Sequence, residues 1–173
     1  MLQELQGCKA WQRDNATMRS SYAKYKVYLH QDVYILNQNF IFDLVALFSS
    51  NETLGLIGMV GTDHLPNNGI WWGVNTKFGK VIENCNTFRY LEFESFDEDI
   101  RCVQGVDRLL MTTQYDIPWR EDLFDGWHFY DPSQCIEFIR HGYEVGVAKQ
   151  RHPWCLHDVG SKHVFDLASC TKY

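Results

Sequence analysis

The sequence has no long hydrophobic run and no excess of positive charge. Its most apolar segment, residues 40–48, includes Asp43 and is much shorter than the roughly 20 residues needed to cross a bilayer. The first thirty positions are polar and charged, so no secretory leader is expected. With 16 Lys and Arg against 22 Asp and Glu, the formal net charge is −6. General binding to nucleic acid or to an anionic membrane depends on clustered basic residues, so this composition argues against both.

The sequence also lacks the cysteine spacing of a disulfide framework or a zinc module. Its six cysteines include no Cys-x-x-Cys pair and are spread over the chain: Cys8, Cys85, Cys102, Cys135, Cys155 and Cys170. Free thiols in a reducing compartment are the expected state, which predicts a cytoplasmic protein. Repeats and low-complexity tracts are missing as well. A single domain over residues 1–173 is expected, with residues 1–14 and 161–173 at its periphery.

Hydrophobic periodicity predicts an α/β domain. Apolar residues at helical spacing indicate helices over residues 3–21 and 40–48, the second capped by Asn39. Glycines within residues 54–61 suit a buried strand that neighbouring elements approach closely. A helix between two strands predicts a βαβ unit. Loops are expected at residues 65–78 and 153–158, a helix from Asp131 to Gly142, and strands at residues 26–30, 54–61, 80–84, 87–94, 100–115 and 144–148.

Asp131 has two interpretations. It follows an aromatic stretch, residues 124–130, and precedes Pro132, which favours the first turn of a helix. A carboxylate at the N-cap stabilises a helix by about 1 kcal/mol, so capping alone explains the residue. The same hydrogen bonds would keep the carboxylate ionised and fixed, as a general base requires. Both roles stay open at this point.

His30 and Asp32 form a second candidate site. They follow a predicted strand at its carboxyl end, where open α/β sheets bind ligands. Alternate residues of an extended backbone point to the same side, so the imidazole and the carboxylate could converge on one ion. A solvated strand end gives the same pattern. His157 is another candidate metal ligand, but no second close Cys or His pair supports structural zinc.

Aromatic residues make up 15% of the chain, and several Trp lie in predicted loops beside Gly, Pro or Asn. Large aromatic side chains are usually core residues. Rings exposed in loops would instead offer a stacking surface for sugars. Both interpretations apply to Trp71, Trp72, Trp119, Trp127 and Trp154.

Four segments together resemble the GT-A glycosyltransferases. They are KYKVYLHQD at residues 24–32, NGIWW at 68–72, QYDIPWREDLFDGWHFYD at 114–131 and PWCLHD at 153–158. The similarity covers about residues 15–160 and is greatest to a glycosyltransferase-like family that includes a streptomycin-biosynthesis protein. It implies a GT-A-like mixed sheet flanked by helices. The first nucleoside-binding strand and helix of that fold have no counterpart in the sequence, so an N-terminally shortened fold is expected.

The resemblance also implies an activity and a partner set. Such a protein transfers a sugar from a nucleotide-diphosphate donor to a hydroxyl acceptor such as a glycan, with inversion at the sugar carbon, and depends on Mn²⁺ or Mg²⁺. Asp32 stands at the metal-binding Asp-x-Asp element, where His30 replaces the first carboxylate. His157 stands at the late His that completes the metal site in several GT-A families.

The remaining roles come from the same resemblance. Asp131 matches the base of the Gly-Trp-Gly-Gly-Glu-Asp element, and Tyr130 replaces its acidic residue, which implies a different acceptor. Trp127 and His128 then line the acceptor side, with Trp71 and Trp72 as further candidates for sugar stacking.

Two other function classes fit the same residues. A noncatalytic carbohydrate-binding domain, or a fragment of a glycosyltransferase, would explain the Trp surface without metal-dependent nucleotide binding. A glycoside hydrolase needs two carboxylates on either side of a cleft. Asp131 with Asp125 or Glu121 is a conceivable pair, but nothing in the sequence specifies one.

Overall fold

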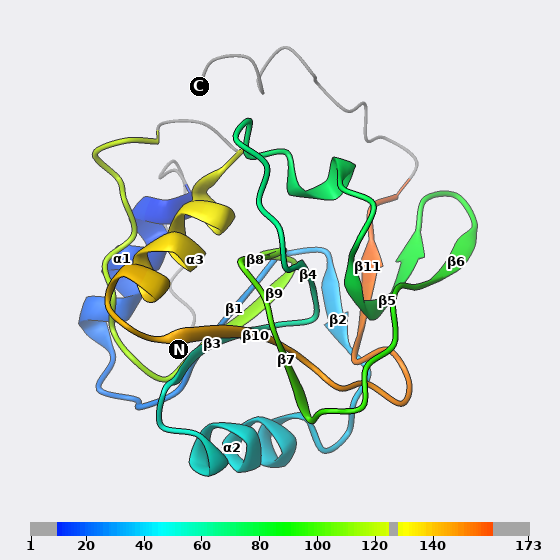
Figure 1. The fold of residues 1–173 in the computed structure, drawn as a ribbon, viewed down its shortest axis with the longest axis horizontal. Coiled ribbons are helices and arrows are strands. Elements are labelled where there is room, and N and C mark those ends of the chain that lie inside the picture. The colour runs from blue at the N-terminus through cyan, green and yellow to red at the C-terminus, as the bar shows by residue number, and fades with distance from the viewer. Residues whose placement is uncertain (1–9, 125–127, 161–173) are drawn as a thin grey trace.

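The computed structural model describes residues 10–124 and 128–160, with side chains from residue 14 onward. Over these residues the chain forms two mixed β-sheets with helices packed around them (Figure 1). Helices α1 and α3 lie on the left of the view and α2 at its base, while β2, β11, β5 and β6 lie on the right. The predicted α/β class is confirmed. No helix in the described part is long and apolar enough to cross a membrane.

Helix α2 shows how the apolar pattern sets the packing. Phe40, Leu44 and Phe48 recur every four residues and are all buried, so one stripe of the helix faces the core. Asn39 takes the predicted cap position, but its side chain makes no capping hydrogen bond. The Asn37 side chain orders this turn instead, because its Oδ1 accepts from the Asn39 N–H at 2.9 Å. The helices are α1 (Ala10–Ser20), α2 (Phe40–Ser50) and α3 (Tyr130–Arg140).

The first sheet has the strand order β1-β9-β3-β10-β7. Strands β1 and β3 both pair antiparallel with β9, which lies between them, and β10 pairs parallel with β3. Strands β1 and β3 therefore run parallel and are connected through α2, as the predicted βαβ unit requires. Strand β9, which comes later in the chain, lies between them. The bounds are β1 (Lys26–Leu29), β3 (Leu54–Gly58), β7 (Ile100–Cys102), β9 (Leu110–Thr113) and β10 (Glu144–Ala148).

The second sheet has the order β2-β11-β5-β4-β8, with β6 paired to β5. Strand β11 lies between β2 and β5, antiparallel to the first and parallel to the second. The C-terminal described strand is thereby held beside the segment that follows β1. The bounds are β2 (Val33–Ile35), β4 (Val60–Thr62), β5 (Phe78–Asn84), β6 (Phe88–Glu92), β8 (Gly105–Val106) and β11 (Cys155–Asp158).

Three predicted boundaries are wrong. The strand expected at residues 54–61 divides at Met59 into β3 and β4, which belong to different sheets. The strand expected at residues 100–115 divides into β7, β8 and β9 for the same reason: the chain passes from one sheet to the other, and burial alone does not reveal this. Residues 153–158, expected as a loop, contain β11, because pairing on both sides stabilises a strand too short to show alternation.

Glycines in the buried strands make room for their neighbours, as expected from their position. A Cβ on Gly58 would lie 2.4 Å from Cβ of Val106, and a Cβ on Gly55 would lie 2.5 Å from the Phe138 ring.

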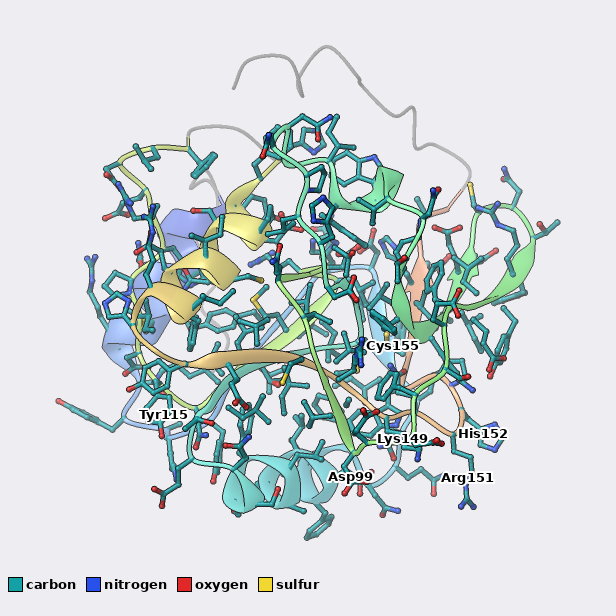
Figure 2. All side chains as sticks on the ribbon, viewed as in Figure 1. Asp99, Tyr115, Lys149, Arg151, His152 and Cys155 are labelled. Carbon is teal, nitrogen blue, oxygen red and sulfur yellow. The ribbon has the colours of Figure 1, made fainter. Side chains whose placement is uncertain are left out.

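Figure 2 shows Cys155 inside the molecule, while Arg151 and His152 point outward from the preceding loop. The loop thus returns from the surface directly into β11.

Candidate active site

The turn after β1 and the strand β11 bring three potential ligands together. Strand β1 ends at Leu29, and the chain turns so that the Val33 N–H donates to the His30 carbonyl at 3.1 Å. Strand β2 then pairs with β11, with Val33 opposite His157. The Asp158 N–H donates to the Asp32 carbonyl at 2.8 Å, which fixes the turn against β11.

Ligand atoms of His30, Asp32 and His157 all lie within 4.8 Å of one another. Nε2 of His157 is 3.6 Å from Oδ1 of Asp32, and the two imidazole centroids are 5.9 Å apart. The extended backbone expected at residues 30–32 is wrong, because these residues form a turn. The turn nevertheless directs both side chains toward His157.

The electrostatics of this group suit a divalent cation. Oδ1 of Asp32 is buried and has no hydrogen-bond partner among the residues that the structure describes. Burial lowers the pKa of His30, and the charges of Arg108 and His157 act in the same direction against Asp107 and Asp32. A neutral imidazole is the form that binds metals. Two imidazole nitrogens and one carboxylate oxygen are a donor set that Mn²⁺ accepts, so the residues present fit the ion.

Asp131 lies in the first turn of α3 and not at its N-cap. Phe129 takes the cap position in a left-handed conformation, with φ of 69°, and its carbonyl accepts from the Ser133 N–H at 3.0 Å. The predicted capping role of Asp131 is therefore wrong. Pro132 is tolerated here because backbone N–H groups of the first helical turn have no partner within the helix.

The surroundings of Asp131 raise its pKa to about 7. Burial is the main cause, and the Asp107 carboxylate adds to it. Hydrogen bonding from the backbone amides of Asp131 and Arg108, together with the Arg108 charge, opposes the increase. A carboxylate that exchanges its proton near neutral pH has the property that a general base needs.

The segment between β8 and β9 contacts both the candidate metal ligand His30 and the candidate base Asp131. The His30 N–H donates to the Leu109 carbonyl at 3.1 Å, while the backbone amide of Arg108 acts on Asp131. Asp107 influences the pKa of both His30 and Asp131. The candidate metal site and the candidate base therefore lie next to the same short segment, residues 107–109.

The comparison with protein families identifies the chain. The model of a glycosyltransferase-like family matches residues 9–172. The chain belongs to this family. No curated protein matches it. Together with the two mixed sheets, this membership confirms the GT-A-like fold class, and it implies a sugar transferase with a nucleotide-sugar donor and an acceptor.

The aromatic residues of this glycosyltransferase-like protein divide into two groups. Trp71 is 6% exposed and packs in the core. Trp72 stacks on Phe129, with ring centroids 6.3 Å apart and an interplanar angle of 18°, and its ring lies 6.3 Å from His128. Of the acceptor residues predicted from the sequence, Trp72 and His128 therefore lie together. The prediction for Trp127 falls outside the described residues.

Sequence reasoning missed Asp14, Asp107 and Arg108. Arg108 is buried, and its guanidinium lies 2.6 and 2.7 Å from the two carboxylate oxygens of Asp14 on α1. A signal was available, since Asp107 and Arg108 interrupt an otherwise apolar run. A charged pair inside such a run requires buried partners.

Proposed function

We propose that the chain is a metal-dependent glycosyltransferase that moves a sugar from a nucleotide-diphosphate donor to an acceptor hydroxyl with inversion. The convergence of His30, Asp32 and His157 around a carboxylate oxygen that lacks a partner within the described ranges carries this proposal. Family membership supplies the sugar-transfer class.

His30, Asp32 and His157 would hold Mn²⁺ or Mg²⁺, and the bound ion would supply positive charge for the diphosphate leaving group. The same positive charge would offset the repulsion between phosphates and a chain with a net charge of −6. The lowered pKa of His30 keeps its ring available as a ligand at neutral pH.

Asp131 would accept the proton of the acceptor hydroxyl while the hydroxyl oxygen bonds to the anomeric carbon. The bond from that carbon to the diphosphate oxygen breaks, and the nucleoside diphosphate leaves with the electron pair. Attack from the face opposite the leaving group inverts the configuration. Trp72 and His128 would line the acceptor, with Trp71 behind them and Trp127 adjoining His128 in the sequence.

Calorimetric titration with UDP, GDP, CDP and TDP, each with and without Mn²⁺, tests the proposal. We expect one nucleotide to bind only with Mn²⁺, and Asp32→Asn to abolish this binding. Asp122→Asn is the matched control, because the Asp122 side chain is exposed and pairs with Arg120. Glycan binding together with no metal-dependent nucleotide binding would overturn the proposal in favour of a noncatalytic carbohydrate-binding domain.

A further inference from the structure

Arg108 is the one buried arginine among the described residues, and both its charge and its backbone amide act on the candidate base Asp131. Its guanidinium carbon is 5.3 Å from the centre of the Tyr130 ring and 5.7 Å from that of Trp119. Tyr130 directly precedes Asp131 in the first turn of α3. Arg108 therefore contacts the first turn of α3 in two ways: its side chain lies against the Tyr130 ring, and its backbone amide acts on Asp131.

Asp14 fixes the direction of this guanidinium. Nη2 of Arg108 lies 2.7 Å from Oδ1 and 2.6 Å from Oδ2 of Asp14, and both side chains are about nine-tenths buried. The next residue, Asn15, donates to the Trp119 carbonyl at 3.0 Å and accepts from the Trp119 N–H at 2.8 Å. Helix α1 is thus anchored where it meets Arg108.

We propose that Asp14 is a positioning residue for sugar transfer, which holds the Arg108 guanidinium on the Tyr130 ring and balances its charge so that Asp131 stays basic enough to accept a proton. The inference rests on the proposed role of Asp131. It extends the site to helix α1.

The charges around Asp131 explain why Asp14 would matter. Four groups interact electrostatically with Asp131: Asp107 and Arg108 between β8 and β9, and Tyr130 and Cys135 on its own helix. Arg108 is the only cation in this set, and a nearby cation favours the ionised carboxylate. The Asp14 carboxylate offsets that cation. Without Asp14, the full charge of Arg108 would act on Asp131 and make it a weaker base.

The test measures the ionisation of Asp131 directly, by ¹³C NMR titration of the aspartate carboxyl groups in the full chain. Asp131→Asn assigns the resonance. We expect Asp14→Asn to lower the Asp131 midpoint by about one pH unit. The double variant Asp14→Asn/Arg108→Gln should return it toward the wild-type value or above it. Asn15→Ala is the matched control, because it removes two α1 contacts without changing charge and should leave the midpoint unchanged.

Arg108→Gln alone is an independent arm in case Asp14→Asn does not fold, and it should raise the midpoint. A folded Asp14→Asn protein with the wild-type midpoint, or an Arg108→Gln midpoint that does not rise, would overturn the inference. In an active enzyme the pH profile of kcat/KM should shift to acid by the same amount in Asp14→Asn. Absence of any transfer would count against the proposed function, while the NMR titration would still decide the role of Asp14.

Discussion

Nε2 of His157 lies 3.6 Å from Oδ1 of Asp32, although the two residues come from opposite ends of the described chain. The contact depends on β11, which pairs with β2 on one side and with β5 on the other. The buried Asp32 oxygen accepts no hydrogen bond from the part of the chain that the structure describes, so the carboxylate is available to a cation. Pairing between strands, and not proximity in sequence, produces this arrangement.

Replacing His157 with Gln should weaken Mn²⁺ binding by at least about 10-fold, because one of the three ligands is lost. Electron paramagnetic resonance of free Mn²⁺ measures the change. His152→Gln is the control, since His152 is exposed on the loop before β11 (Figure 2). Equal affinity of both variants would contradict the assignment of His157.

The raised pKa of Asp131 predicts a pH-dependent stability. Its folded pKa of about 7 lies above the value of about 3.9 for an unfolded aspartate. Between these values the folded state keeps a proton that the unfolded state has released, so stability falls as the pH rises from about 4 to about 7. The full effect has an upper limit on the order of 4 kcal/mol.

Urea unfolding of wild type and Asp131→Asn at pH 4 and pH 8 measures this effect. The variant does not ionise at this position, so its stability relative to wild type should be greater at pH 8. Asp122→Asn is the control, because Arg120 lowers the pKa of that exposed carboxyl, so it stays ionised over most of this pH range and the effect of its replacement should depend little on pH. A stability difference for Asp131→Asn that is independent of pH would contradict the prediction.

Gly69→Ala should disturb the contact between the loop before Trp71 and the start of α3. Gly69 has φ of +71°, and a Cβ there would lie 2.9 Å from Cδ1 of Phe129. The left-handed conformation alone costs an alanine about 1–2 kcal/mol, and the contact with Phe129 adds to this.

Gly142→Ala separates the two contributions, because Gly142 has φ of +84° and no atom of a described residue would lie within 4 Å of a Cβ there. We expect Gly69→Ala to lower the free energy of unfolding more than Gly142→Ala does. Only Gly69→Ala should also raise KM for the acceptor, since Phe129 stacks on Trp72. Identical losses in the two variants would show that the Phe129 contact is unimportant.

Thiol reactivity should follow burial. Cys102 is exposed, although partial burial also raises the pKa of its thiol, whereas burial raises the pKa of Cys135 and Cys155 to about 12. A thiol-specific reagent should label Cys102 in the native protein and reach the two buried thiols only on unfolding. Mass spectrometry of the labelled peptides resolves the positions, and Cys102→Ser should remove the early label from the peptide that contains residue 102. Early labelling of Cys135 would contradict its position in the core.

Local pattern was sufficient to predict much of the fold. The apolar stripe of α2 and the glycine-containing strand β3 are where the periodicity indicates them. The pattern does not show where a buried run changes sheets, as at Met59, because both sheets bury the residues on either side of it. Sheet membership depends on partners far along the chain.

The candidate site was also predictable only in part, because some of its residues interact with partners far along the chain. The residue pattern and the resemblance to glycosyltransferases both pointed to His30, Asp32 and His157, which the structure brings together. Neither pointed to Arg108, whose partner Asp14 lies on another element. Electrostatic partners that come from distant segments leave little trace in a local pattern.

The position of β9 has a consequence for synthesis on the ribosome. Strand β9 lies between β1 and β3, yet it follows both in the chain. A nascent chain that ends before Leu110 contains the two flanking strands but lacks the strand that joins them. Strands β1 and β3 cannot pair with β9 until residues 110–113 have been synthesised, so their edges facing β9 stay unpaired until then. Pairing between strands so far apart in the sequence is slow.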